Sequence, residues 1–247
     1  MPSGGIVRVL AEFDVGVQGA RSALSRLTGR GLLQRTKRGR RTYYALTPQA
    51  IRVLKSGAER IFGLGSEAAA WDGTWSVVAF TIPESDRGLR NSLRTNLRWL
   101  TFAPLYDGVW ISPHPRLEAA EQTVRRMGIS SVTLFRARAH PERLADGELL
   151  KAWDLEGLAR RYQDFIIRFR PLQDRVLNNQ VGPPEAMVAR TRVMDAYRVF
   201  PADDPDLPEQ LLPASWPRNE AGELALDIYE RLRPAAEEHF HRLLDES

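Results

Sequence analysis

Residues 20–48 constrain the fold of this chain most, because they join a cationic amphipathic helix to a glycine-centred hairpin. The stretch holds eight arginine or lysine residues and no acidic residue. Apolar residues recur at a helical spacing, which predicts a helix over Val17–Arg30. The runs Leu32–Thr36 and Arg41–Leu46 read as strands, and Gly39 between them favours a tight turn. The pattern predicts a helix followed by a β-hairpin.

Two further helices flank this stretch. The pattern predicts a short apolar helix over Ile6–Phe13, and Pro48 suits the first turn of another helix that runs to about Phe62. A helix, a second helix, a hairpin and a helix are the layout of a winged helix-turn-helix, here over residues 1–64. In that layout the second helix enters the major groove of DNA and the hairpin forms the wing.

The charge of the chain is unevenly distributed. Residues 1–65 hold twelve basic and three acidic residues, a net charge of +9, whereas the other 182 residues hold 23 basic and 28 acidic residues, a net charge of −5. Such an asymmetry suggests that the first segment meets a polyanion. Charge alone also fits a basic face that only keeps the protein soluble.

The winged-helix interpretation assigns side chains to DNA. On the helix, Gln18, Ser22 and Arg26 are candidates for base edges, because Gln pairs with adenine and Arg with guanine. Arg21 and Ser25 are candidates for phosphate or base. The wing candidates for phosphate are Lys37, Arg38, Arg40 and Arg41, with Arg38 or Arg40 in the minor groove. Neighbouring residues of a strand point to opposite faces, so one of Tyr43 and Tyr44 is expected in the core and the other at the surface. We take Tyr43 as the surface residue, a candidate for contact with a phosphate.

A flexible stretch, Gly63–Ala70, predicts a linker to a second domain over residues 71–145. Its pattern is strand, helix, strand, strand, helix, strand, a ferredoxin-like unit. The predicted elements are Trp75–Ile82, Asp86–Leu100, Phe102–Tyr106, Val109–Ser112, Pro115–Met127 and Ser131–Ala139. An arginine stripe on the first helix (Arg87, Arg90, Arg94, Arg98) favours a solvated or interdomain face over a nucleic-acid contact.

The third domain, residues 148–247, is predicted to be entirely helical. Its helices are Leu155–Arg170, Pro184–Phe200 and Ala221–Leu244, with a proline-rich loop over Pro201–Pro217. The fold class is therefore α+β and multidomain. The six tryptophans are expected to be core and interdomain anchors because of their large apolar area.

Four separated motifs resemble the PaaX-like family of bacterial regulators, the phenylacetic acid degradation repressors. They are "RSALSRL…GRRTYYALTP", "WDGTWSVVAFTIPE…LRWLTFAPLYDGVWISP", "AWDLEGLARRYQDF" and "DPDLPEQLLPASWP". The resemblance implies a winged helix, a middle domain like the small CRISPR spacer-integration subunit, and a helical last domain. Family members usually carry a further helix before the glycine pair seen here at Gly4-Gly5. We therefore expect either a late start codon or a winged helix without its first helix.

The family also implies a small-molecule effector, because its founding members release DNA when they bind phenylacetyl-coenzyme A. An acyl-CoA requires basic residues for its phosphates and an apolar slot for its acyl group. Residues in or beside the motifs are the candidates, although a structural role fits most of them as well. They are Trp110, His114, Trp153, Arg161, Arg190, Tyr197 and Arg198.

Several functional classes are disfavoured. The chain has no cysteine, which excludes disulfides, thiol catalysis and cysteine-based metal sites. No apolar run is long enough to span a bilayer and no signal peptide is evident, so a cytoplasmic protein without a membrane partner is expected. His239 and His241 lie two apart and share no helix face, which makes a poor metal pair. We expect no cofactor and no enzymatic activity.

These observations favour a sequence-specific transcriptional regulator, an effector-responsive repressor that binds a palindromic operator as a homodimer. The effector is an aryl- or acyl-CoA or a related metabolite. The alternative from another class is a metal-dependent nuclease or a nucleic-acid scaffold built on the ferredoxin-like domain, although no Asp follows the strand Trp75–Ile82 before Pro83. A third alternative is a small-molecule-binding remnant that has lost DNA binding.

Overall fold

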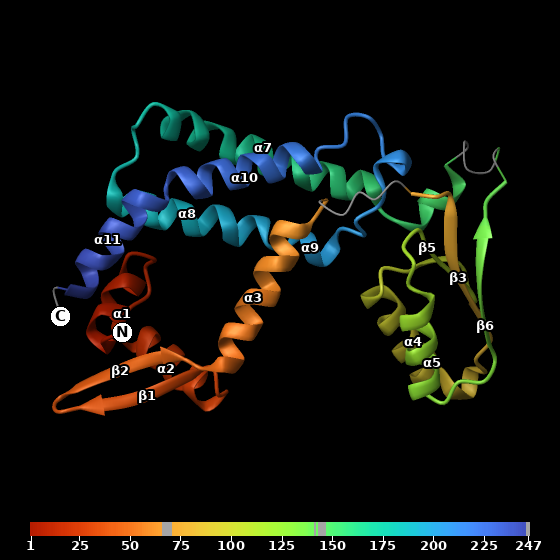
Figure 1. Ribbon diagram of the computed structural model, residues 1–247, viewed down its shortest axis with the longest axis horizontal. Helices are drawn as coiled ribbons and strands as arrows, with labels where there is room; N and C mark the ends of the chain where they lie inside the picture. The colour runs from red at the N-terminus through yellow and green to blue at the C-terminus, as the bar shows by residue number, and fades with distance from the viewer. Residues whose placement is uncertain (66–70, 141, 143–146, 246–247) are drawn as a thin grey trace. The chain divides into compact units, whose positions relative to one another are not determined.

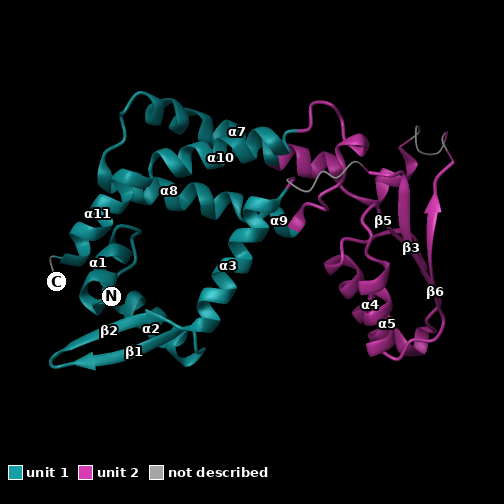
Figure 2. Ribbon diagram, in the orientation of Figure 1, with its two compact units in different colours: residues 1–64, 162–202, 217–247 teal, residues 65–161, 203–216 magenta. Residues whose placement is uncertain are grey.

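The computed structural model describes residues 1–65, 71–140, 142 and 147–245 (Figure 1). Its helices and two antiparallel sheets confirm the mixed α+β class, and the part that follows residue 154 is helical. Most of the predicted linker Gly63–Ala70 lies outside the described residues. Contacts divide the chain into two compact units (Figure 2): residues 1–64, 162–202 and 217–247 form unit 1, and residues 65–161 and 203–216 form unit 2.

Unit 1 begins with the predicted helix, helix, hairpin and helix. The elements are α1 Ser3–Ala11, α2 Val17–Gly29, β1 Leu33–Arg38, β2 Arg41–Leu46 and α3 Pro48–Gly63. Ala20 and Leu24 are buried and hold α2 against its neighbours. Thr47 joins two elements, because its hydroxyl accepts from the Ala50 N–H as the cap of α3 and donates to the Gly31 carbonyl at 2.7 Å.

Two glycines set the geometry of the hairpin. Gly31, just beyond α2, has φ +69°, a backbone conformation that favours glycine at a helix end. Gly39 has φ +60° in the two-residue turn between the paired residues Arg38 and Arg41. Tight hairpin turns favour glycine at this position. The predicted turn is confirmed, and it places the basic cluster at the hairpin tip.

The rest of unit 1 is helical. Its helices are α7 Leu155–Leu177, of which the first seven residues belong to unit 2, α8 Pro183–Tyr197, α9 Phe200–Asp203, α10 Arg218–Arg231 and α11 Arg233–Asp245. Aromatic side chains form the core between them: Tyr162 stacks on Phe200 with ring centroids 4.0 Å apart, and Phe165 packs on Phe169 at 4.8 Å.

Two predicted helix boundaries were wrong. Ala221–Leu244 is not one helix, because the chain breaks at Leu232 between α10 and α11. Pro234, in the first turn of α11, explains the break, since it lacks an N–H and its ring would clash with the carbonyl four residues earlier in a continuous helix. The helix predicted to end at Arg170 continues through Pro171 to Leu177. Phe169 and Val176, one on each side of this proline, are both buried and keep the helix packed on one face.

The C-terminal helix α11 packs against α1 at the start of the chain. The Arg8 guanidinium donates to the Leu243 carbonyl, with Nε at 3.0 Å, across 235 positions in the sequence. Nearby, Nε2 of the buried His239 lies 3.3 Å from a carboxylate oxygen of Glu12. The two ends of the chain therefore stabilise each other within unit 1 (Figure 1).

Replacing Arg8 with alanine should lower the stability of unit 1 by about 1.5–3 kcal/mol, the usual contribution of hydrogen bonds from a charged donor. The measurement is urea denaturation followed by circular dichroism. Arg192→Ala is the control, because the exposed Arg192 guanidinium is 3.9 Å from Asp14 and such pairs contribute about 0–1 kcal/mol. Equal midpoints for the two variants would contradict a structural role of Arg8.

Unit 2 contains the second sheet. Its elements are β3 Thr74–Phe80, α4 Arg87–Trp99, β4 Ala103–Tyr106, β5 Val109–Ser112, α5 Leu117–Arg126 and β6 Val132–Arg138, with short 3₁₀ helices η1 Glu84–Asp86, η2 Glu148–Ala152 and η3 Glu209–Leu211. The predicted order of strands and helices is confirmed. The strands pair in the order β4-β5-β3-β6, each pair antiparallel.

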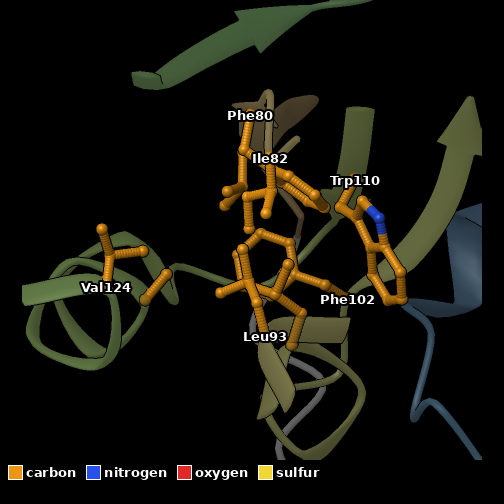
Figure 3. Close-up of a cluster of buried hydrophobic side chains, with 9 residues drawn as sticks. Phe80, Ile82, Leu93, Phe102, Trp110 and Val124 are labelled. Carbon is orange, nitrogen blue, oxygen red and sulfur yellow. The ribbon is translucent and has the colours of Figure 1, made fainter. Parts of the chain in front are cut away.

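Side chains that alternate along β3 form two cores on the two faces of the sheet. On one face, Val78 and Phe80 pack with Leu93, Phe102 and Trp110 from α4 and the β4–β5 hairpin (Figure 3). The other face buries Trp75, Val77, Ile111 and Leu211. Both faces are covered, which explains the continuous apolar run in β3.

The tryptophans do not all act as anchors. Trp75 and Trp110 are buried, and Trp75 stacks on Trp153 with ring centroids 6.2 Å apart. Trp99, in contrast, is 69% exposed, so its assignment as a core anchor was wrong. It lies two positions after the buried Leu97, and two positions on a helix correspond to a rotation of about 200°.

Candidate nucleic-acid interface

Helix α2 presents a polar face to solvent. All five predicted reading residues on it are exposed: Gln18, Arg21, Ser22, Ser25 and Arg26. Ala20 and Leu24, on the other side of the helix, are 0% and 5% exposed. The helix is thus held by one face, and the opposite face offers an amide, two hydroxyls and two guanidinium groups, which suit hydrogen bonding to base edges and phosphates.

The hairpin tip concentrates positive charge. Lys37, Arg38, Arg40 and Arg41 are all exposed. Arg38 and Arg41 face each other across the strand pair, an arrangement that is unfavourable for like charges without a counter-charge. Tyr43 is half-buried, and the Arg38 guanidinium lies 5.7 Å from the centre of its ring. Tyr44, also half-buried, exchanges two backbone hydrogen bonds with Met1, at 2.8 and 2.9 Å.

The eight basic side chains within residues 20–48 differ from most other arginines of the chain. Among the residues that the structure describes, no carboxylate lies within 4.0 Å of any of these eight cations. Arginines elsewhere are mostly paired, as in Arg170 with Glu220 and Arg175 with Glu185. Arg175 lowers the pKa of the Glu185 carboxyl by hydrogen bonding to it. Unpaired surface cations leave a positive field that attracts a polyanion.

Sequence reasoning did not assign two other cations of this surface. Arg30 follows α2 directly and Arg35 lies in β1, and both are exposed without a carboxylate partner within the described chain. Both lie in the stretch of residues 20–48, which contains no acidic residue, and this position could have identified them as candidates for DNA contact. We add both to the candidate phosphate contacts.

The arginine stripe on α4 differs from this surface, because three of its four members, Arg90, Arg94 and Arg98, are engaged within unit 2. Arg90 pairs with Glu84, and Arg94 pairs with Asp107. The Arg98 guanidinium lies 5.3 Å from the centre of the Trp110 ring. A pocket of about 300 Å³ lies beside them, lined by Arg94, Arg98, Tyr106 and Trp110 among others.

Three of the seven predicted effector residues lie near one another in unit 2. Trp153 and Arg161 line a pocket of about 190 Å³ in unit 2, together with Asp203 and Pro205. Arg161 pairs with Asp203 at 2.6 Å, and Nε2 of His114 lies 3.0 Å from the Pro205 carbonyl oxygen. His114, Trp153 and Arg161 are thus neighbours through Pro205.

The remaining effector candidates have other surroundings. Trp110 belongs to the core of unit 2. In unit 1, Arg190 donates to the Tyr229 carbonyl at 2.9 Å and lies 3.5 Å from the centre of its ring. Tyr197 is buried against Phe165, and Arg198 pairs with Asp195 at 2.7 Å. These contacts fit structural roles.

Neither a metal cluster nor a membrane span is found in the part of the chain that the structure describes. No three His, Asp or Glu side chains there group closely enough to hold a metal ion. No described helix is both long and apolar enough to cross a bilayer.

Comparisons with known proteins place this arrangement in a family. Three family models match in succession: "PaaX-like protein" over residues 1–50, "PaaX protein central Cas2-like domain" over 68–149 and "PaaX-like protein C-terminal domain" over 153–242. The chain is 29% identical over 241 residues to the transcriptional repressor PaaX of Escherichia coli (strain K12), which covers 94% of this chain and 74% of the relative.

A solved structure has a similar fold. The uncharacterized protein Rv0674 from Mycobacterium tuberculosis superposes with a TM-score of 0.62 at 22% sequence identity, over 94% of this chain and 88% of that chain. The three family models follow one another in the same order as the predicted motifs and together match most of the sequence. The resemblance is confirmed, and the chain belongs to the PaaX-like family.

Proposed function

We propose that this chain is a DNA-binding transcriptional repressor whose unit 1 carries the DNA-reading surface. The observation that carries the proposal is a set of eight exposed arginine and lysine side chains over residues 20–48. None of them has a carboxylate partner among the described residues. The similarity to a protein named a transcriptional repressor supports it. The protein acts on double-stranded DNA, in the cytoplasm and without catalysing a reaction.

Residues 1–64 act as a winged helix-turn-helix in this proposal. Helix α2 enters the major groove with Gln18, Ser22 and Arg26 at base edges, and Arg21 and Ser25 at its margin. The hairpin is the wing, with Lys37, Arg38, Arg40 and Arg41 at phosphates and Tyr43 as a hydroxyl donor. Residues 71–145 are a ferredoxin-like domain, in agreement with the sheet order β4-β5-β3-β6, and residues 148–247 are the helical domain.

A small molecule regulates the protein in this proposal. The pocket beside Trp153 and Arg161 is the best-supported location among the candidates, because His114 reaches its Pro205 wall. An anionic group of a CoA thioester or a related metabolite would compete with Asp203 for Arg161. The protein binds a palindromic operator as a homodimer, so that each copy reads one half-site.

A binding assay tests the proposal directly. Fluorescence anisotropy with the duplex upstream of the gene should show tighter binding than a scrambled duplex of the same length and composition at moderate salt. Specific binders exceed their own non-specific affinity by roughly 10³- to 10⁷-fold. Equal affinities for the two duplexes would refute a sequence-specific repressor.

The wing should supply salt-dependent affinity. The double variant Arg38→Ala with Arg40→Ala should reduce the slope of log affinity against log salt by roughly 1.8, because each phosphate contact contributes roughly 0.9. Titrations between low and moderate salt measure this slope. Arg160→Ala with Arg168→Ala removes the same charge from exposed positions on α7 and should leave the slope unchanged. Equal slopes for both double variants would exclude the wing from DNA contact.

A further inference from the structure

The pocket of about 300 Å³ between α4 and the β4–β5 hairpin of unit 2 has the features of a ligand site. Its wall includes the side chains of Arg94 and Arg98, which lie one turn apart on α4, and the indole of Trp110 from β5. It shares no lining residue with the pocket at Trp153. Ligand pockets usually span roughly 300–1,000 Å³, so this one has room for a small organic molecule.

The polar groups of this pocket are mostly hydrogen-bond donors. Arg94 pairs with Asp107, whereas Arg98 has no carboxylate within 4.0 Å among the described residues and lies over the Trp110 ring. The Trp110 side chain is buried, and within the described chain its Nε1–H has no hydrogen-bond partner. A buried donor without a partner is costly, and an oxygen atom of a bound ligand would remove that cost.

These donors favour a phosphate group. A phosphate monoester has three terminal oxygen atoms and a charge of about −1.5 to −2 at pH 7, and arginine binds phosphate through two parallel hydrogen bonds. The Asp107 side chain is 88% exposed, so its pairing with Arg94 contributes little to stability and a phosphate can displace it. The pocket therefore suits a dianion better than a neutral or cationic group.

The hairpin side of the pocket suits a planar group. Pro104, Leu105 and Tyr106 lie there, and Tyr106 is 70% exposed. The register of β4 shifts by one residue at Leu105, a kind of bulge that is common beside active sites. An exposed aromatic ring provides a surface on which a nucleobase of any sequence stacks.

The turn of this hairpin is fixed against β3. The Phe80 N–H donates to the Gly108 carbonyl at 2.8 Å, and a Cβ added at Gly108 would lie 2.5 Å from the Phe80 carbonyl oxygen. Glycine at this position thus allows the turn to approach β3 closely, which holds the neighbouring Asp107 and Tyr106 beside α4. The pocket wall is therefore largely pre-formed, as ligand sites usually are.

We propose that this pocket binds a nucleoside monophosphate, with its phosphate at Arg94, Arg98 and the Trp110 N–H and its base against Tyr106. The inference goes beyond the proposed repressor function, because the site shares no residue with the DNA-reading surface or with the pocket at Trp153. Binding is therefore measurable on the full chain without DNA.

Calorimetric titration of the full chain with AMP tests the site, and one molecule should bind per chain. Arg98→Ala should weaken binding roughly tenfold or more, because it removes charge-assisted hydrogen bonds. Arg87→Ala is the control, since it removes the same charge from an exposed position of α4 outside the pocket and should leave the affinity unchanged. No saturable binding of AMP, or an equal loss in the two variants, would overturn the site.

A change that strengthens binding separates a ligand contact from a structural role. Asp107→Asn should tighten AMP binding several-fold, because it releases Arg94 and removes a negative charge beside the phosphate. The turn should be retained, since Asn before Gly suits a hairpin turn as well as Asp does. Unchanged or weaker binding would overturn the placement of the phosphate at Arg94.

Two smaller probes identify the part of the ligand that is recognised. Ribose 5-phosphate, which lacks the base, and inorganic phosphate should each bind several-fold more weakly than AMP. Tyr106→Ala should weaken AMP binding roughly fivefold or more and leave ribose 5-phosphate unaffected, because only the base stacks on the ring. Equal affinities for AMP and ribose 5-phosphate, or an equal effect of Tyr106→Ala on both, would overturn the nucleotide as the ligand.

Discussion

Replacing Arg26 with alanine should weaken binding to the upstream duplex by roughly 5- to 150-fold, since a bidentate contact to a base contributes roughly 1–3 kcal/mol of discrimination. Arg26 is exposed in the last turn of α2, and in the described chain no carboxylate holds it. Its guanidinium is therefore available to the O6 and N7 atoms of guanine.

Comparison of two duplexes distinguishes base readout from general attraction. Anisotropy titrations of the upstream duplex and a scrambled duplex should show that Arg26→Ala loses affinity mainly for the first. Arg160→Ala, which removes an equal charge from α7, should change neither titration appreciably. If Arg26→Ala lost the same factor on both duplexes, Arg26 would be a phosphate contact only.

Replacing Trp110 with alanine should destabilise unit 2 by about 3–5 kcal/mol, the usual cost of truncating a buried large aromatic residue. Trp110 is 1% exposed and packs among Phe102, Leu93 and Phe80 (Figure 3). The cost is a large fraction of the roughly 5–15 kcal/mol by which a domain is usually stable. Urea denaturation followed by circular dichroism should show a clear loss.

The control for this variant is another tryptophan of the same unit. Trp99→Ala removes an indole that is 69% exposed and should change stability by no more than about 0.5 kcal/mol. Similar midpoints for the two variants would mean that Trp110 contributes little to the core. That result would favour a role of Trp110 in effector binding over its role in the core of unit 2.

Local patterns predicted most of the elements correctly. The apolar spacing around Leu24, the turn glycine Gly39 and the proline Pro48 act over a few residues, so helix α2, the hairpin and α3 are confirmed almost to the residue. The same holds for the strand and helix order of unit 2. The alternation of apolar and polar residues in strands and the helical periodicity of apolar residues are local properties that can be read directly from the sequence.

Long-range packing was not predictable from these patterns. Arg8 and Leu243 meet across 235 positions, and no local signal links them. Pro234, which causes the break at Leu232, was visible in the sequence, but the apolar periodicity on both sides of it suggested one continuous helix. The exposure of Trp99 depends on which side of α4 the sheet covers, a fact of tertiary structure.

The candidate site was predictable in its chemistry but not in its electrostatic balance. A basic stretch without acids is plain in the sequence, whereas the pairing of Arg170 with Glu220, 50 positions apart, required the fold. Only the structure distinguishes an arginine that has a nearby carboxylate from Arg26, which has none among the described residues. The operator bases opposite α2 depend on DNA geometry, which no feature of the chain encodes.

The packing of α11 on α1 also has a consequence for synthesis in the cell. A ribosome releases α3 long before α11. At roughly 5–20 residues per second, the 169 residues between them take on the order of ten to thirty seconds to synthesise. During that time the nascent N-terminal segment lacks its C-terminal support. Operator occupancy should therefore depend on finished chains, and a premature stop just before Arg233 should silence the protein although every DNA-facing residue has been translated.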